Sequence, residues 1–96
     1  MTTREEVLER DDYTCRMCAM GDQEAPEGGW GNVLDTHHID GRLGDRLKDS
    51  SRMVTLCRWH HLYSVNSPHG NPKGWRENVL ERIELYLNAT KPEGDL

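Results

Sequence analysis

Residues 34–61 decide the fold of this chain, and they read LDTHHIDGRLGDRLKDSSRMVTLCRWHH. The stretch begins with the histidine pair His37–His38 and ends with Cys57 and the second pair His60–His61. A Cys-x-x-Cys segment, Cys15–Cys18, lies upstream. Together these segments hold all three cysteines and four of the five histidines of the protein. Such a concentration of metal-binding side chains predicts a small protein that folds around metal.

Length and composition predict one domain that needs extra stabilisation. The chain has 96 residues, of which 34% are hydrophobic and none is Phe. A chain of this size buries a thin apolar core, and a structural zinc site would add on the order of 10 kcal/mol of folding free energy. We expect a single domain over residues 1–96, with its core at about residues 4–66 and a closing helix at about residues 74–88.

The cysteine count and the charge indicate the setting of the protein. Three cysteines at metal-ligand spacing favour reduced thiolates, which is typical of the cytoplasm. No apolar run has the length of a membrane span, and the N-terminus has no signal-peptide pattern. A formal net charge of −5 argues against a protein that coats nucleic acid by charge alone. We therefore expect a soluble intracellular protein without membrane contact.

Local signals predict an α+β fold. The expected order is helix, strand, strand, helix and helix, at about residues 4–10, 33–39, 53–56, 58–65 and 74–88. Because side chains alternate along a strand, His37 and His38 must face opposite sides. Breakers make Ser67–Gly74 a loop. In the last helix an apolar face closes the core, with a spacing of four residues between Trp75, Val79, Ile83 and Leu87.

Two short knuckles predict a structural zinc site. Cys15 and Cys18 offer two sulfurs, and Cys57 and His60 offer a sulfur and a nitrogen. Zinc prefers four such ligands in a tetrahedron, and four protein ligands leave no open position for a reaction. The alternatives are a redox pair at Cys15–Cys18, or a buried apolar Cys57 beside a surface His60. The matched spacing of the two knuckles favours zinc.

The remaining residues give the chain a resemblance to the HNH endonuclease family. The matching segments are Leu34–Ile39 with its histidine pair, the strand Met53–Cys57, and His61 directly after the second knuckle. Val7–Cys18 is similar to the N-terminal flank of zinc-containing members. The resemblance covers about residues 4–63, and its combined spacing is more specific than any single segment.

The resemblance implies a ββα-metal core, in which a hairpin carries the first histidines and a helix carries the last. It implies that His38 is the general base that activates water for attack on a phosphodiester. It also implies that His37 and His61 hold a catalytic divalent cation. The sequence leaves Mg²⁺, Mn²⁺, Ni²⁺ and Zn²⁺ open as that cation. Read alone, His37–His38 would be an ordinary pair of strand histidines.

Arg52 departs from the family pattern. Members usually have Asn at this position, where it helps to orient the general base, and Arg has no acceptor group for that purpose. We expect Arg52 to take part in the catalytic site through phosphate. Otherwise Asp49 or Ser51 orients His38, or activity is reduced.

Basic and polar residues near the histidines are further candidates. Arg42, Arg46 and Lys48 lie between the strands, where they are either DNA-backbone contacts or a solvated loop. Asn66 and His69 follow the last family ligand and could contact metal or DNA. A helix-end or loop position without such a role is favoured for both.

These observations predict a metal-dependent DNA endonuclease that nicks or cuts as a monomer or weak dimer. From the resemblance, short freestanding members occur in phages and mobile elements, and some act beside terminase subunits. That context implies a bacterial or phage-infected cell. The alternatives are a zinc-stabilised module that binds nucleic acid or protein without catalysis, a nuclease acting on RNA, and a redox protein built on Cys15 and Cys18.

Overall fold

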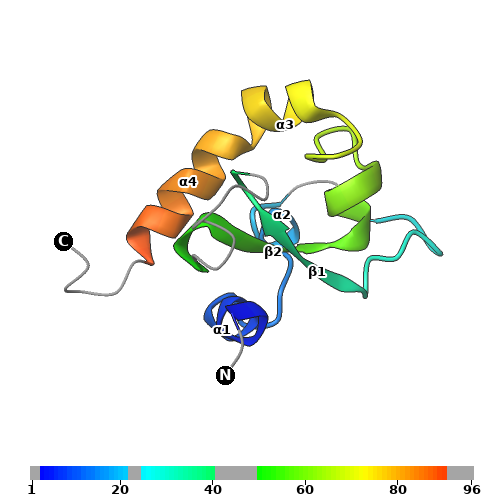
Figure 1. Cartoon of the computed structure of the whole chain (residues 1–96). Helices are drawn as coiled ribbons and strands as arrows, with labels where there is room; N and C mark the ends of the chain where they lie inside the picture. Colours follow the sequence, from blue (N-terminus) through cyan, green and yellow to red (C-terminus); the bar gives the residue numbers. More distant parts are fainter. Residues whose placement is uncertain (1–2, 22–24, 41–49, 91–96) are drawn as a thin grey trace.

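A two-stranded antiparallel sheet lies between two groups of helices (Figure 1). The computed structural model describes residues 3–21, 25–40 and 50–90. The elements follow in the order α1 (Thr3–Arg10), α2 (Arg16–Ala19), β1 (Leu34–His38), η2 (Ser50–Arg52), β2 (Met53–Cys57), η3 (Trp59–Tyr63), α3 (Pro72–Asn78) and α4 (Leu80–Ala89). This mixed architecture agrees with the predicted α+β class, and both strands lie where the sequence predicts them.

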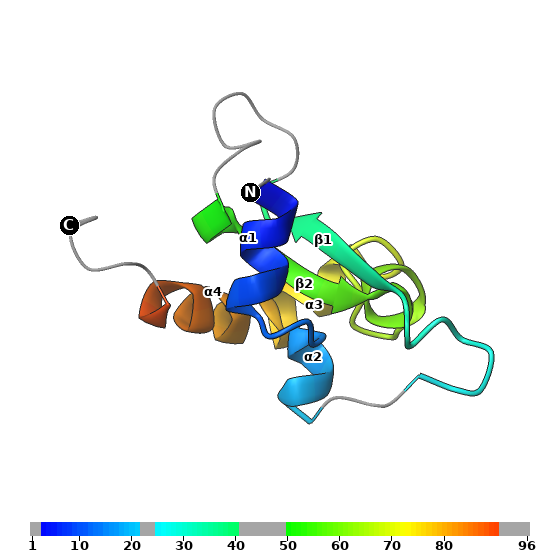
Figure 2. The same cartoon turned by 90° about the horizontal axis from the view of Figure 1, so that it is seen from below.

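The register of the hairpin places the histidine pair of β1 at one end and Cys57 at the other. Leu34 pairs with Cys57 at one end, and His38 pairs with Met53 at the other. All five residues of β2 are buried, whereas most of β1 is half-buried. In Figure 1, α1 lies on the opposite side of the sheet from α3 and α4, and Figure 2 shows α1 crossing the sheet with α2 at its end. β2 is therefore the centre of the core, and β1 is the edge that faces outward.

The closing helix packs as its periodicity predicts but is divided in two. Trp75, Val79, Ile83 and Leu87 are all buried in the core against β2 residues such as Leu56. The chain bends at Val79, which separates α3 from α4. No helix in the described part of the chain combines the length and the apolarity needed to cross a membrane.

The start of α3 corrects the predicted loop at Ser67–Gly74. The helix begins at Pro72, inside that segment, because Asn71 caps it. The Asn71 side chain accepts a hydrogen bond from Gly74 N at 3.2 Å. Proline suits the first helical position, where its missing N–H has no partner to lose and its φ is already helical. The breaker residues thus start a helix here.

The helix expected at residues 58–65 is shorter and wider than an α-helix. η3 is a π-helix over Trp59–Tyr63, and the backbone N–H of Ser64 donates to Trp59 O at 2.8 Å. Single π turns often occur at functional sites because they change which side chains share a helix face. This turn carries both His60 and His61.

A buried carboxylate joins α1 to the rest of the core. Asp11 is fully buried directly after α1, and it accepts hydrogen bonds from Arg10, from Thr55 N at 2.9 Å and from the hydroxyl of Tyr86. Burial alone would raise the pKa of Asp11, but the hydrogen bonds from Arg10, Tyr86 and Thr55 lower it below its usual value. Asp11 therefore links α1, β2 and α4 as a charged group.

Candidate functional site

The four predicted zinc ligands meet in one cluster. Cys15 and Cys18 come from the start of α2, Cys57 ends β2, and His60 lies on η3. The Sγ atoms of Cys15, Cys18 and Cys57 lie 3.4, 3.3 and 3.1 Å from His60 Nδ1. Cys18 is exposed, and the other three residues are buried.

The donor set and its spacing fit a tetrahedral ion. Around zinc, sulfur at about 2.3 Å and nitrogen at about 2.0 Å would lie roughly 3.6 Å apart, close to the separations found here. A hydrogen bond from the Cys57 thiol lowers the pKa of Cys15 and so favours its thiolate, the form that binds metal. This Cys3His cluster can hold a structural metal ion such as zinc.

A second cluster consists of three histidines from separate segments. His37 lies on β1, His61 on η3, and His69 in the loop between η3 and α3. Their ligand nitrogens lie within 4.8 Å of one another. The ring centroids are 5.2 Å apart for His37 and His61, 5.2 Å for His37 and His69, and 4.7 Å for His61 and His69. This geometry suits a metal ion bound by three imidazoles.

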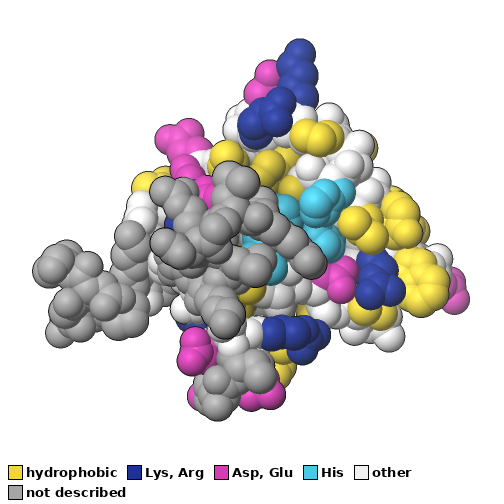
Figure 3. Space-filling model, in the orientation of Figure 1, with side chains coloured by type: hydrophobic (Ala, Val, Ile, Leu, Met, Phe, Trp, Pro, Cys, Tyr) yellow, Lys and Arg dark blue, Asp and Glu magenta, His cyan; other side chains and the backbone are white. Residues whose placement is uncertain are grey.

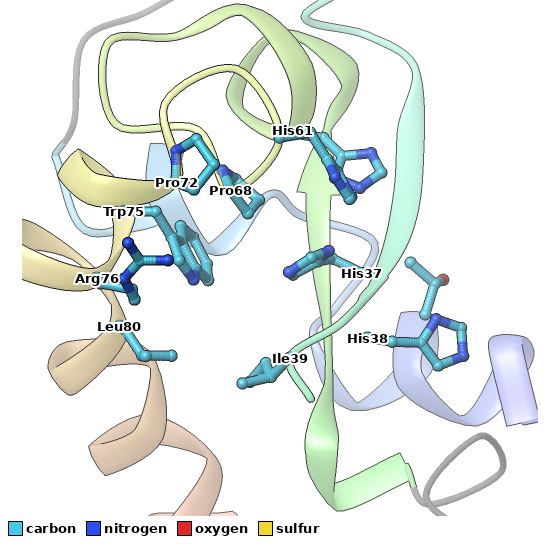
Figure 4. Close-up of a pocket in the computed structure, with 11 residues that line it drawn as sticks. His37, His38, Ile39, His61, Pro68, Pro72, Trp75, Arg76 and Leu80 are labelled. Carbon is cyan, nitrogen blue, oxygen red and sulfur yellow. The ribbon is translucent and has the colours of Figure 1, made fainter. Parts of the chain in front are cut away.

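The two neighbouring histidines of β1 point in different directions. Figure 4 shows His37 entering the space between β1 and α3, and His38 on the other side of the strand. His37 is only 8% exposed, whereas His38 is half-buried. The predicted separation of their positions is confirmed.

His69 belongs to the cluster although the sequence favoured an ordinary loop residue. Its backbone N–H approaches His61 O at 3.4 Å, which ties the loop to η3. The next residue must be glycine, because a Cβ at Gly70 would lie 2.3 Å from Leu62 O and 2.4 Å from Ser67 Oγ. The available signal was a histidine between Pro68 and Gly70, in a loop short enough to fold back onto η3.

Asp35 is a second residue that sequence reasoning missed. Its Oδ2 lies 3.1 Å from His61 Nδ1, and its Oδ1 accepts from Arg58 at 3.3 Å. A carboxylate on one imidazole nitrogen fixes the ring and leaves the other nitrogen for a metal, as is common in metal sites. The available signal was its position two residues before His37, on the same face of the strand.

Burial favours the neutral form of His37 and His61. Burial, together with the nearby His61, His69 and His38, lowers the pKa of His37 to about 3. The pKa of His61 is also lowered: burial is the largest cause, His69 and Arg58 add to it, and Asp35 opposes it. Neutral imidazole is the form that binds metal.

A pocket and a groove meet at these histidines. The pocket, of about 410 Å³, contains the three-histidine cluster, and its other walls are mainly apolar. The groove, of about 610 Å³, contains Arg4, Arg58 and Tyr63. His38 and His61 line both. Figure 3 shows histidine side chains reaching the surface near the middle of this face.

Arg52 is held away from the cluster by two carboxylates. Its guanidinium donates to Asp40 at 2.8 Å and to Glu84 at 2.9 Å, and it lines neither the pocket nor the groove. The hydrogen bond to Asp40, with that to Glu84, raises the pKa of Arg52 above its usual value. A catalytic role of Arg52 stays a prediction, and this geometry favours a structural role in joining the hairpin to α4.

Only some of the other residues proposed as DNA or metal contacts lie in the described part of the structure. Arg42, Arg46, Lys48 and Asp49 lie outside the described residues. Asn66 accepts from Asn78 Nδ2 at 3.1 Å, so it joins the loop to α3, in agreement with the loop position favoured for it.

No family model, curated protein or solved structure matches this chain. The similarity to HNH endonucleases therefore stays a hypothesis that rests on the residues quoted above. The function must be argued from the two clusters, the pocket and the groove.

Proposed function

We propose that this protein is a metal-dependent DNA endonuclease of the HNH type, built on a ββα-metal core. The observation that carries the proposal is the convergence of His37, His61 and His69, with Asp35 orienting one of them. The order hairpin, then helical turn, also supports a ββα core. Three imidazoles from separate segments that line one pocket, two of them with a lowered pKa, are typical of a functional metal site.

The three imidazoles would hold the divalent cation. Neutral nitrogen ligands favour Zn²⁺, Ni²⁺ or Mn²⁺ over Mg²⁺, which prefers oxygen. When bound, the cation would polarise the phosphoryl group and stabilise the leaving oxygen. His37, His61 and His69 would each contribute one nitrogen, which leaves other positions for oxygen atoms of the substrate.

His38 is the proposed general base. It borders both the pocket and the groove, so a phosphate lying where they meet would be within reach of its imidazole. There, the ring would accept a proton from the attacking water and orient it toward phosphorus. The opposite orientation of His37 supports this division of roles, because one residue can bind metal while its neighbour stays free of it.

The Cys3His cluster would bind structural zinc and thereby position the reactive residues. His60 and His61 are consecutive on η3, so an ion on His60 fixes the backbone that presents His61. We further propose DNA as the partner. An association with phage terminase subunits rests on the family resemblance alone. A single active site suggests that the protein acts as a monomer or weak dimer.

A zinc-stabilised binding module without catalysis is the second candidate. The observation that favours it is the pair of ion pairs that Arg52 forms with Asp40 and Glu84. In the family this position carries Asn that orients the general base, whereas here it joins the hairpin to α4. Such a module would keep the Cys3His cluster and lack cleavage.

One experiment separates the two candidates. Supercoiled plasmid is incubated with the zinc-loaded protein and Mg²⁺, Mn²⁺, Ni²⁺ or Zn²⁺, beside His38→Ala and His37→Ala. We expect metal-dependent relaxation, which His38→Ala lowers by about 100-fold or more because a general base contributes that much. Arg82→Ala, on the exposed surface of α4, is the control. A folded protein that cleaves with none of these metals, or a His38→Ala variant as active as the wild type, would overturn the nuclease proposal.

A further inference from the structure

The pocket lined by the three histidines also has apolar walls that a bound cation and phosphate would not contact favourably. Figure 4 shows Trp75, Arg76 and Leu80 along one wall and Ile39, directly after β1, opposite them. Pro68 and Pro72 close one end. Cations and phosphates are strongly hydrated and gain nothing from such walls, whereas flat apolar groups do. The lining therefore points to a ligand with an uncharged, largely apolar part beside its phosphate.

We propose that this pocket receives the base of an unpaired nucleotide next to the cleaved phosphate, so that the preferred substrate is non-duplex DNA. The inference rests on the proposed nuclease function and names its substrate class. A volume of about 410 Å³ suits a group of nucleotide size, within the range of ordinary ligand pockets. A base inside a duplex is stacked and paired, and it can enter a pocket only when it leaves the helix.

Charge at the mouth of the pocket agrees with this occupant. Arg76 is exposed on α3 and lines the pocket, so its guanidinium can pair with the phosphate next to the bound base. His37, His61 and His69 lie at the other side of the same pocket. A nucleotide with its base in this pocket would thus have one phosphate at Arg76 or at the histidines.

The adjoining groove provides a path for the rest of the strand. Arg4 and Arg58 line it, and Tyr63, which is 55% exposed, offers an aromatic face. Guanidinium groups along a groove with an exposed aromatic ring are typical of single-strand binding, where phosphates pair with arginine and bases stack. His38 and His61 border both spaces. A single strand can therefore pass from the pocket into the groove alongside His38, the proposed general base.

Four DNA substrates of the same sequence test the inference with the zinc-loaded wild-type protein and Mn²⁺. They are a full duplex, a single strand, a duplex with one bulged nucleotide, and the same bulge without its base. We expect kcat/KM to be ~10-fold or more higher for the single strand and the bulge than for the duplex, because extruding a paired base is costly. The bulge should be cut at the phosphate beside the unpaired nucleotide. The bulge without its base should lose most of the increase in kcat/KM over the duplex.

The outcomes distinguish this inference from the proposed function. Cleavage of the duplex at the same rate as the bulge would overturn the substrate class and leave the nuclease intact. Equal cleavage of the bulge with and without its base would overturn the base pocket, because backbone flexibility would then explain the preference. If a folded, zinc-loaded protein cleaved none of the four, the nuclease proposal and this inference would both be wrong.

Two surface variants test the pocket and the groove directly. Arg76→Glu should raise KM for the bulged substrate several-fold with little change in kcat, and Arg82→Glu, the same charge change on exposed α4, should not. Arg4→Ala should weaken binding of the single strand and lower the slope of log Kd against log salt by about 0.7, as expected for one lost phosphate contact. An unchanged KM in Arg76→Glu together with an unchanged slope in Arg4→Ala would contradict the proposed strand path.

Discussion

Among the single side chains of the site, Asp35 lies between a proposed metal ligand and an arginine. Its carboxylate contacts His61 Nδ1 on one oxygen and Arg58 on the other. Burial alone would raise its pKa, but Arg58 and His61 lower it below the usual value, so the group is ionised at neutral pH. An ionised carboxylate here would fix the orientation of the His61 ring for the proposed cation without binding that cation itself.

Replacing Asp35 should therefore lower the affinity of the proposed site for its cation, although Asp35 is not itself a ligand. We expect Asp35→Asn to lower the affinity for Mn²⁺ or Ni²⁺ by about 10- to 100-fold, as is typical for the loss of such a partner. Titration calorimetry measures the affinity, and elemental analysis should find the structural zinc unchanged. Asp12→Asn, an exposed acid next to α1, is the control. Equal affinities of Asp35→Asn and the wild type would show that His61 needs no orienting carboxylate.

Gly70 allows the position of His69 for a steric reason, because there is no room for a side chain at residue 70. A Cβ at this position would lie 2.3 Å from the backbone oxygen of Leu62, so Gly70→Ala must move the loop that carries His69. We expect the variant to lose as much cation affinity as His69→Ala does. Because both changes would remove the same ligand, the double variant should be no worse than either single one. Additive losses in titration calorimetry would contradict this account.

At the scale of elements, Asp11 is the joint between α1, β2 and α4. Removing its charge leaves Arg10 without its buried partner, so we expect Asp11→Asn to lower the free energy of unfolding by about 3 kcal/mol at pH 7. Urea denaturation measures this difference. Asp12→Asn, its exposed neighbour, should change stability little.

The same variant has a defined pH dependence. The pKa of Asp11 is lowered from 3.8 in the folded state, so its stabilising effect is present above that value and is lost as the pH falls through the folded pKa. The stability difference between wild type and Asp11→Asn should therefore shrink below pH 3.8. Comparing the two proteins at each pH removes the common effect of acid on the thiolates. A difference that stays constant down to pH 3 would show that the charge of Asp11 is not what stabilises the joint.

The elements differ in how far the sequence predicts them. The buried face of α3 and α4, from Trp75 to Leu87, follows from a local period, and it was predicted correctly. The start of α3 was missed because Asn71 and Pro72 are turn residues in one context and a helix cap in another. The bend at Val79 and the π form of η3 were also missed, since both depend on packing that no local pattern encodes.

The candidate site likewise has residues that a local pattern predicts and residues that only the folded structure brings together. The Cys3His cluster was predictable because its ligands lie at a fixed, short spacing within each knuckle. Asp35 and His69 were not, because each acquires its role only when distant segments meet: 26 positions separate Asp35 from His61 in the chain. The ion pairs of Arg52 with Asp40 and Glu84 arise in the same way.

For the molecule as a whole, the Cys3His cluster and the apolar core are parts of one structure. Cys15 and Cys57 pack among Met17 and Leu56, so the proposed zinc would hold α2 and β2 together from within the core. We expect removal of zinc by a strong chelator to abolish the cooperative thermal transition, since such an ion contributes on the order of 10 kcal/mol. Circular dichroism follows the unfolding, and elemental analysis follows the metal.

Two variants accompany the chelation experiment. Cys57→Ser should behave like the zinc-free protein, because it removes one of the four ligands. His38→Ala should melt like the wild type, because this half-buried side chain lies outside the Cys3His cluster. A zinc-free wild type that melts at the same temperature as the zinc-loaded protein would refute a structural role for the ion.

The adjacency of His60 and His61 on η3 gives the protein an order of events in time. If zinc fills the Cys3His cluster, a newly made chain that has not yet acquired it would have no fixed η3 and would not hold His61 against His37 and His69. Under the proposed function, synthesis and DNA cutting would then be separate steps, with zinc uptake between them. The cell that makes the protein would be exposed to a working nuclease only after zinc uptake had completed the enzyme.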